Sequence, residues 1–153
     1  MAGPALDAVY VIACGARKAP QADIARSLYC GQGFQGALRA AEAQARWCAS
    51  QRMEAGVLIL SALHGLITPD TFIAPYDLQM GQPGSVTPRV VAAQAAWHGI
   101  TQACDVFGLL PHAYLAVLDA ALSPAAIWVQ DVYERCRGIG DHRQVNRTLQ
   151  ESA

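Results

Sequence analysis

Short apolar runs rich in β-branched residues alternate along the chain with longer stretches of helical character. The runs are typical of buried strands, and they lie at residues 9–13, 57–61, 106–110 and 126–129. Helices are predicted at residues 34–51, where apolar side chains recur every three or four positions, and at 88–104, 112–122 and 141–150. This alternation predicts an α/β fold, a three-layer sandwich in which helices flank a mostly parallel sheet of four or five strands.

Turn-forming residues mark the remaining segments. Residues 20–29 are predicted to form a short helix or helical turn, and Thr87 is the expected N-cap of the helix that begins at Pro88. The segment at 64–84 is rich in Gly, Pro and Asp, and loops longer than about 12–15 residues are usually functional. A chain of 153 residues predicts one domain, residues 1–153.

Composition narrows the class of protein. A charged fraction of only 15% leaves room for a subunit interface, so a homo-oligomer is expected. A net charge of −1 gives no global field for nucleic acid, although residues 1–52, with six basic and three acidic groups, offer either a phosphate-binding face or a solvated helix surface. Five scattered cysteines without a Cys-x-x-Cys pair indicate reduced thiols. With no signal peptide and no run long enough to span a membrane, a cytoplasmic protein is expected.

The loop after the first strand is the first candidate site. The strand ends at Cys14-Gly15, and Arg17 and Lys18, the only lysine of the chain, follow. In open α/β sheets ligands bind outside the carboxyl ends of the strands. Lys18 and Arg17 are therefore candidates to hold a phosphate or carboxylate, and Cys14 beside two cations is either a nucleophile or a buried, unreactive thiol.

The second candidate region follows the strand at 57–61. If the first two strands are neighbours, Ser61 and His64 face the same crevice as the first loop. His64 is either a general acid or base or a loop residue that caps a carbonyl. Farther along, Asp77 is the best carboxylate for a base or a ribose contact, although Pro75-Tyr76-Asp77 is also typical of a rigid turn.

Two other patterns are set aside. Residues 31–36 fit the dinucleotide pattern G-x-G-x-x-G, but they do not follow the first strand directly, so a glycine turn before a helix is expected and no cofactor is implied. No residue cluster has metal-ligand spacing, so no metal is expected. His98 and His112 are interpreted as structural helix residues, and His142 is expected to be solvated.

Several short motifs occur in a fixed order along the chain. They are Cys14-Gly15 with Lys18, Leu28-Tyr29 with Gly31 and Phe34, Ser61-Ala62 with Gly65-Leu66, Pro75-Tyr76-Asp77, and Gly138-Ile139-Gly140. Together they resemble an uncharacterised family of small bacterial and phage proteins, and the resemblance covers nearly the whole chain. The chain departs from that family's pattern at Ala13, where serine is usual, and at Leu63, where lysine is common.

The resemblance implies a compact α/β domain without a settled activity. Its Cys-x-x-Lys strand end is similar to elements of domains that process nucleobases, including the archaeosine synthase type and the peroxide-stress DNA-binding type. The first hypothesis is therefore an enzyme that acts on a nucleotide, nucleoside or modified nucleobase. The expected catalytic residues are Cys14, His64 and Asp77, and the expected binding residues are Gly15, Arg17, Lys18, Tyr29, Phe34, Ser61, Gly65 and Tyr76. Within this set, Tyr29 or Tyr76 would stack on a base.

Two other hypotheses stay open. One is a non-catalytic module that binds a nucleotide or nucleic acid in the same crevice and works as an oligomer. The other is an α/β scaffold without a small-molecule site. Neither hypothesis requires a membrane.

Overall fold

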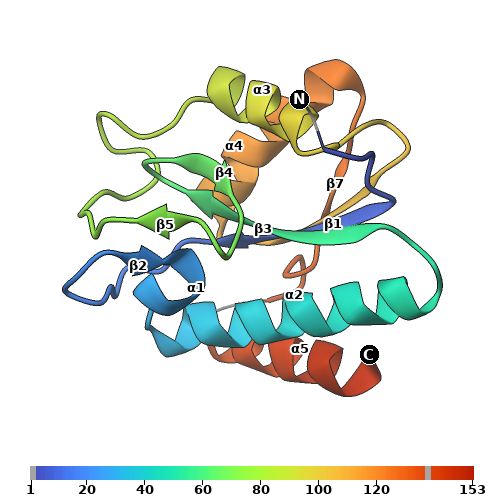
Figure 1. The fold of residues 1–153 in the computed structure, drawn as a ribbon, viewed down its shortest axis with the longest axis horizontal. Coiled ribbons are helices and arrows are strands. Elements are labelled where there is room, and N and C mark those ends of the chain that lie inside the picture. The colour runs from blue at the N-terminus through green and yellow to red at the C-terminus, as the bar shows by residue number, and fades with distance from the viewer. Residues whose placement is uncertain (1–2, 137–138) are drawn as a thin grey trace.

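Five strands form a mixed sheet in the order β4-β3-β1-β6-β7, as Figure 1 shows for the computed structural model, which describes residues 3–136 and 139–153. The parallel strands are β1 (Ala8–Ala13), β3 (Ala55–Ser61), β6 (Asp105–Leu109) and β7 (Val129–Asp131). The fifth strand, β4 (Gly65–Ile67), runs antiparallel to β3. The predicted, mostly parallel sheet is confirmed.

Helices cover both faces of the sheet (Figure 1). One layer consists of α2 (Gln32–Ser50) and α5 (Ile139–Ser152), and the other consists of α3 (Pro88–Trp97) and α4 (His112–Leu122). Alternate side chains of β1 point to opposite layers: Ile12 packs in the cluster that includes α2, and Val11 packs in the cluster that includes α3 and α4. The three-layer α/β architecture follows from this arrangement.

Strand order places a ligand-binding position at the end of β1. The chain passes from β1 through α2 to β3 on one side, and later enters β6 on the other side of β1. Because the chain first adds β3 on one side of β1 and then crosses to add β6 on its other side, the carboxyl ends of β1 and β6 border a topological switch point. Ligands of doubly wound sheets bind in the crevice at such a point.

Of the short helix or helical turn predicted at 20–29, the structure contains one turn, α1 (Ala25–Leu28). The preceding residues are extended instead: β2 (Asp23–Ile24) pairs with β5 (Phe72–Ile73). The backbone N–H groups of Ala25 and Arg26 donate to carbonyls of the long segment at 64–84, which holds this short helix against the loop. That segment is also more ordered than predicted, because it contains β4 and β5.

Two other boundaries differ from prediction. The helix predicted at 88–104, which is α3, ends at Trp97. Gly99 adopts a φ of +83° there and turns the chain away. The start of α3 is confirmed: Thr87 accepts a hydrogen bond from the Val90 N–H, and proline occupies the first turn. The last strand lies at 129–131 rather than 126–129, because a 3₁₀ turn, η1 (Ser123–Ala125), precedes it and Ala126 is left-handed. In the late glycine motif, Gly138 lies outside the described residues.

Candidate functional site

Two cavities meet at the loop that follows β1. Residues 14–16 line both of them. The lysine cavity, of about 300 Å³, is lined by residues 14–16, Lys18, residues 77–80, Ala113 and Tyr114. The aromatic cavity, of about 440 Å³, lies against the last residues of β1 and β6 and is lined chiefly by residues 13–16, Gly31, Gly33, Phe34, Leu109, Tyr133, His142, Arg143 and Asn146. At the topological switch point, therefore, a cavity lies on each side of the loop formed by residues 14–16.

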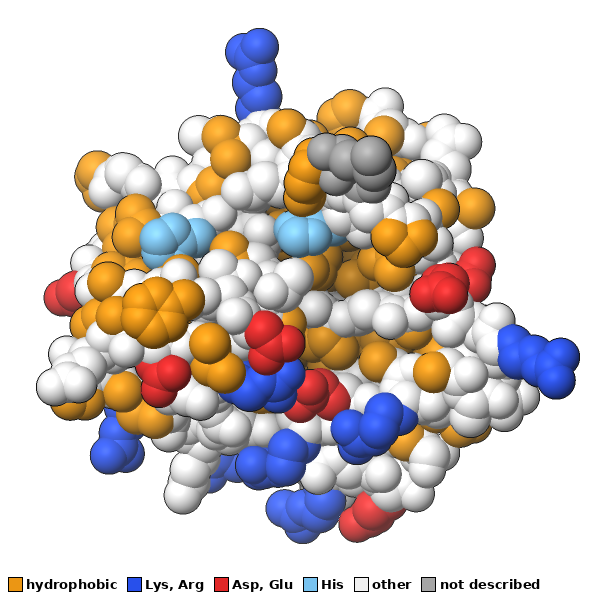
Figure 2. All heavy atoms as spheres, in the orientation of Figure 1, with side chains coloured by type: hydrophobic (Ala, Val, Ile, Leu, Met, Phe, Trp, Pro, Cys, Tyr) orange, Lys and Arg blue, Asp and Glu red, His pale blue; other side chains and the backbone are white. Residues whose placement is uncertain are grey.

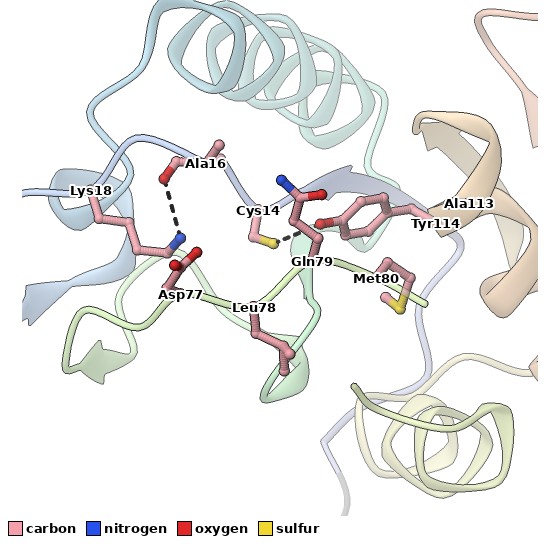
Figure 3. A pocket seen from close by; sticks show the side chains of 10 residues that line it. Cys14, Ala16, Lys18, Asp77, Leu78, Gln79, Met80, Ala113 and Tyr114 are labelled. Atoms are coloured by element: carbon pink, nitrogen blue, oxygen red, sulfur yellow. Dashed lines mark hydrogen bonds between the residues drawn. The ribbon is translucent and has the colours of Figure 1, made fainter. Parts of the chain in front are cut away.

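Aromatic rings hold Lys18 at the edge of the lysine cavity. Its ammonium group lies 4.4 Å from the centre of the Tyr76 ring and 5.8 Å from that of Tyr29, and it donates to the Ala16 carbonyl at 3.3 Å. Figure 3 shows Lys18 and Asp77 at one end of the cavity, with Cys14 between them and Tyr114. Within the described part of the chain Lys18 forms no ion pair. Its charge is thus available to a ligand.

A chain of hydroxyl groups lies beneath Lys18. The Ser61 hydroxyl accepts the backbone N–H groups of Leu63 and His64 at 3.2 and 3.0 Å. A hydroxyl oxygen has two acceptor sites, so the Ser61 proton is left to donate to the Tyr76 oxygen, 2.6 Å away. Tyr76 in turn donates to the Tyr29 oxygen at 2.6 Å. The backbone N–H groups of the turn after β3 thereby decide which hydroxyl donates and which accepts in both of these hydrogen bonds.

Burial keeps these phenols neutral. It raises the pKa of Tyr76 and of Tyr29 above the ordinary value, and the nearby Cys14 adds to the effect at both. On the other side of the thiol, the Tyr114 hydroxyl lies 3.3 Å from Cys14 Sγ, and burial raises the pKa of Tyr114 as well. The phenols near Cys14 are therefore neutral, and none of them is available as a base.

His64 and Gly65 support the site from outside the cavities. The half-buried His64 ring meets the Tyr76 ring edge-on, with centroids 5.5 Å apart, and burial lowers its pKa. The Gln94 side chain donates to the His64 carbonyl at 2.9 Å and accepts the Leu66 N–H at 2.8 Å, across Gly65. Gln94, which the sequence analysis did not identify, thus fixes the turn between β3 and β4.

The predicted site residues fall into three groups. Those that line a cavity are Cys14, Gly15, Lys18, Phe34 and Asp77. Those that lie beside the cavities, in the hydroxyl chain or the turn that anchors it, are Tyr29, Ser61, His64, Gly65 and Tyr76. Arg17 is exposed and lines neither cavity. The structure therefore gathers most of the predicted residues near the loop that follows β1. Only some of them line a cavity that a ligand can enter.

The far wall of the aromatic cavity contains residues that the sequence analysis did not identify. His142 was expected to be solvated, which is wrong: its ring stacks on Tyr133, with centroids 4.0 Å apart and 8° between the planes. The Tyr133 hydroxyl donates to Asn146 Oδ1 at 2.6 Å, and burial raises the pKa of Tyr133 to about 12. His142 and Asn146 are four residues apart on α5, a spacing that places both on one helix face. That spacing was the signal available in the sequence.

Residues 9–145 match the family of unknown function DUF6884. The chain belongs to this family. The DUF6884 match runs from β1 into α5 and therefore includes the two cavities and the loop they share. No curated protein and no solved structure gives a significant match.

The described residues of this DUF6884 protein contain neither a metal-ligand cluster nor a membrane-spanning helix. Among the described residues, no three His, Cys, Asp or Glu side chains converge on a position for a metal ion. Across the same residues, every helix is too short or too polar to cross a membrane.

Proposed function

We propose that this DUF6884 protein is an enzyme that acts on a nucleotide, nucleoside or modified nucleobase, with a bond made or broken at a ribose or base carbon. The observation that carries the proposal is the pair of cavities that share residues 14–16 at the carboxyl ends of β1 and β6. Doubly wound sheets bind mononucleotides and dinucleotides at this position.

The aromatic cavity suits the base of such a ligand. Phe34 and the stacked pair of Tyr133 and His142 supply flat aromatic walls, and Asn146 supplies a polar group in the lining. Ligand sites are typically apolar clefts of about 300–1,000 Å³ with a few polar groups that fix orientation. The volume of about 440 Å³ lies within that range.

The lysine cavity suits the chemical step. Asp77 provides a carboxylate that can accept a proton, and Lys18 provides a positive charge for an oxygen or nitrogen that becomes negative as the bond breaks. Cys14, which lines both cavities, is placed to contact the reacting part of the ligand. Ser61, Tyr29 and Tyr76 are positioning residues in this scheme, because they hold the surface on which Lys18 rests.

A panel of nucleobases, nucleosides and nucleotides tests the proposal. A ligand present at 100 times its Kd raises the free energy of unfolding by about 2.7 kcal/mol, which a thermal shift detects. Each ligand that binds is then incubated with the protein, and products are identified by chromatography and mass spectrometry. A panel without any shift would overturn the proposal.

Variants assign the chemical role. Asp77→Asn should still bind the ligand but lose about 10²–10⁴-fold in turnover, the usual contribution of a positioned general base. Asp119→Asn, which removes an exposed carboxylate from α4, should retain turnover. Binding without turnover in the natural protein would favour the non-catalytic module instead, and unchanged turnover in Asp77→Asn would remove Asp77 as the base.

A further inference from the structure

A groove between α2 and α5 gathers arginines around a hollow of about 390 Å³. We call it the arginine groove; its defining residues are Arg39 of α2 and Arg143, Asn146 and Arg147 of α5. None of the described residues that line it is acidic. Figure 2 shows Lys and Arg side chains gathered on the lower part of the molecule, where α2 and α5 lie.

The arginines of the groove, Arg39, Arg143 and Arg147, have no ion-pair partner among the residues that the structure describes. Arg26, by contrast, contacts Glu42 at 3.1 Å and Asp70 at 2.9 Å. Arg26, which joins two segments, is thus neutralised by carboxylates. The three arginines around the hollow have no such partner among the described residues. An arrangement of this kind suits an anion, because each guanidinium offers a planar pair of donors.

Asn146 joins the arginine groove to the aromatic cavity. Its side chain is 4% exposed, and its Oδ1 accepts the Tyr133 hydroxyl, which fixes the orientation of the amide group. No buried side-chain nitrogen or oxygen of the described residues lacks a hydrogen-bond partner, so Nδ2 of Asn146 is not a buried, unsatisfied donor. Asn146 lines both hollows, where its amide group can contact a ligand.

We propose that the arginine groove binds the phosphate of the ligand whose base occupies the aromatic cavity. The substrate class is then a nucleoside phosphate rather than a free base or nucleoside. Arg143 and Asn146 line both hollows, so one small molecule can extend from one into the other. This inference rests on the proposed function. A net charge of −1 favours a small phosphorylated ligand over a nucleic acid, which relies on a broad basic surface.

The test compares ligands that differ only in phosphate. Isothermal titration calorimetry measures the Kd of purine and pyrimidine nucleosides and of their 5′-monophosphates, with inorganic phosphate as a third probe. The test variant is Arg39→Gln with Arg147→Gln; the control is Arg46→Gln with Arg89→Gln, which also removes two exposed positive charges. Circular dichroism confirms that each variant folds.

The natural protein should bind a monophosphate at least tenfold more tightly than its nucleoside. The Arg39→Gln, Arg147→Gln variant should lose that difference while nucleoside binding stays unchanged, and the control should retain it. Asn146→Asp keeps the acceptor for Tyr133 but places a carboxylate beside the phosphate, so it should weaken monophosphate binding about 100-fold or more. These changes correspond to charge-assisted hydrogen bonds lost one or two at a time.

Equal affinity for nucleoside and monophosphate in the natural protein would overturn this inference and leave the proposed function in place. Arginine-dependent binding of oligonucleotides, without binding of mononucleotides, would overturn it in favour of a nucleic-acid site. If neither nucleosides nor monophosphates bind, the proposed function fails. Inorganic phosphate then decides whether the arginine groove is an anion site. If phosphate binds the natural protein but not the Arg39→Gln, Arg147→Gln variant, the anion site is retained. If phosphate does not bind, the anion site is overturned as well.

Discussion

Removing one hydroxyl from the chain beneath Lys18 should destabilise the fold measurably. In Tyr76→Phe the two hydrogen bonds of 2.6 Å, from Ser61 and to Tyr29, are lost. Ser61 and Tyr29 are fully buried, so water cannot readily replace the missing partner. A net hydrogen bond contributes about 0.5–1.5 kcal/mol, and an unsatisfied buried group costs about 1–3 kcal/mol. The free energy of unfolding should therefore fall by about 2–3 kcal/mol.

Urea denaturation followed by circular dichroism measures this change. With a slope of about 1–3 kcal/mol per molar urea, the midpoint should fall by about 1 M at an unchanged slope. Tyr29→Phe removes only one of the two bonds and should cost about half as much. The double variant should cost less than the sum of the two, because both single variants break the same bond. A Tyr76→Phe protein within about 0.5 kcal/mol of the natural one would refute the directed chain.

Three further predictions concern neighbouring residues. Gly65→Ala should lower the free energy of unfolding by about 2 kcal/mol or more in the same assay, because φ is +74° and a Cβ would collide with Gln94; unchanged stability would contradict the strain. Burial lowers the pKa of His64, so just below pH 6.5 the unfolded chain binds more protons than the folded protein. The free energy of unfolding should therefore fall as the pH drops through that region. In His64→Gln this fall should be smaller. Iodoacetamide should label the exposed Cys30 faster than Cys14; equal rates would show that the hydrogen bond to Tyr114 and partial burial do not protect Cys14.

The sequence predicted the sheet well for a physical reason. A central parallel strand is buried on both faces, so β1 is a continuous apolar run whose end can be located within a residue or two. The position of Cys14 followed from that end. The antiparallel strand β4 was not predicted, because it has only three residues and its identity depends on the pairing of Leu66 with Leu60 across a turn. Such pairing leaves no periodic pattern in so short a run.

The site was predicted as a set of residues rather than as an arrangement. Ser61 and Tyr29 were expected to contact a ligand, and the structure places both in the interior, where they orient Tyr76. The aromatic cavity was not predicted at all. It joins Phe34 of α2 to Tyr133 and α5, about a hundred residues away, and helical periodicity shows which face is apolar but not which element covers it.

The way Lys18 is held bears on which part of the site meets an anion. A carboxylate partner would fix the ammonium group but would also cancel its charge. The rings of Tyr76 and Tyr29 hold it by their π-faces, which attract a cation without neutralising it. Burial keeps both phenols in the neutral form, so neither becomes a competing anion. The hydroxyl chain from Ser61 therefore does more than stabilise the loop: it supports the rings that hold the only lysine of the chain, which forms no ion pair among the described residues, at a cavity that also contains Asp77.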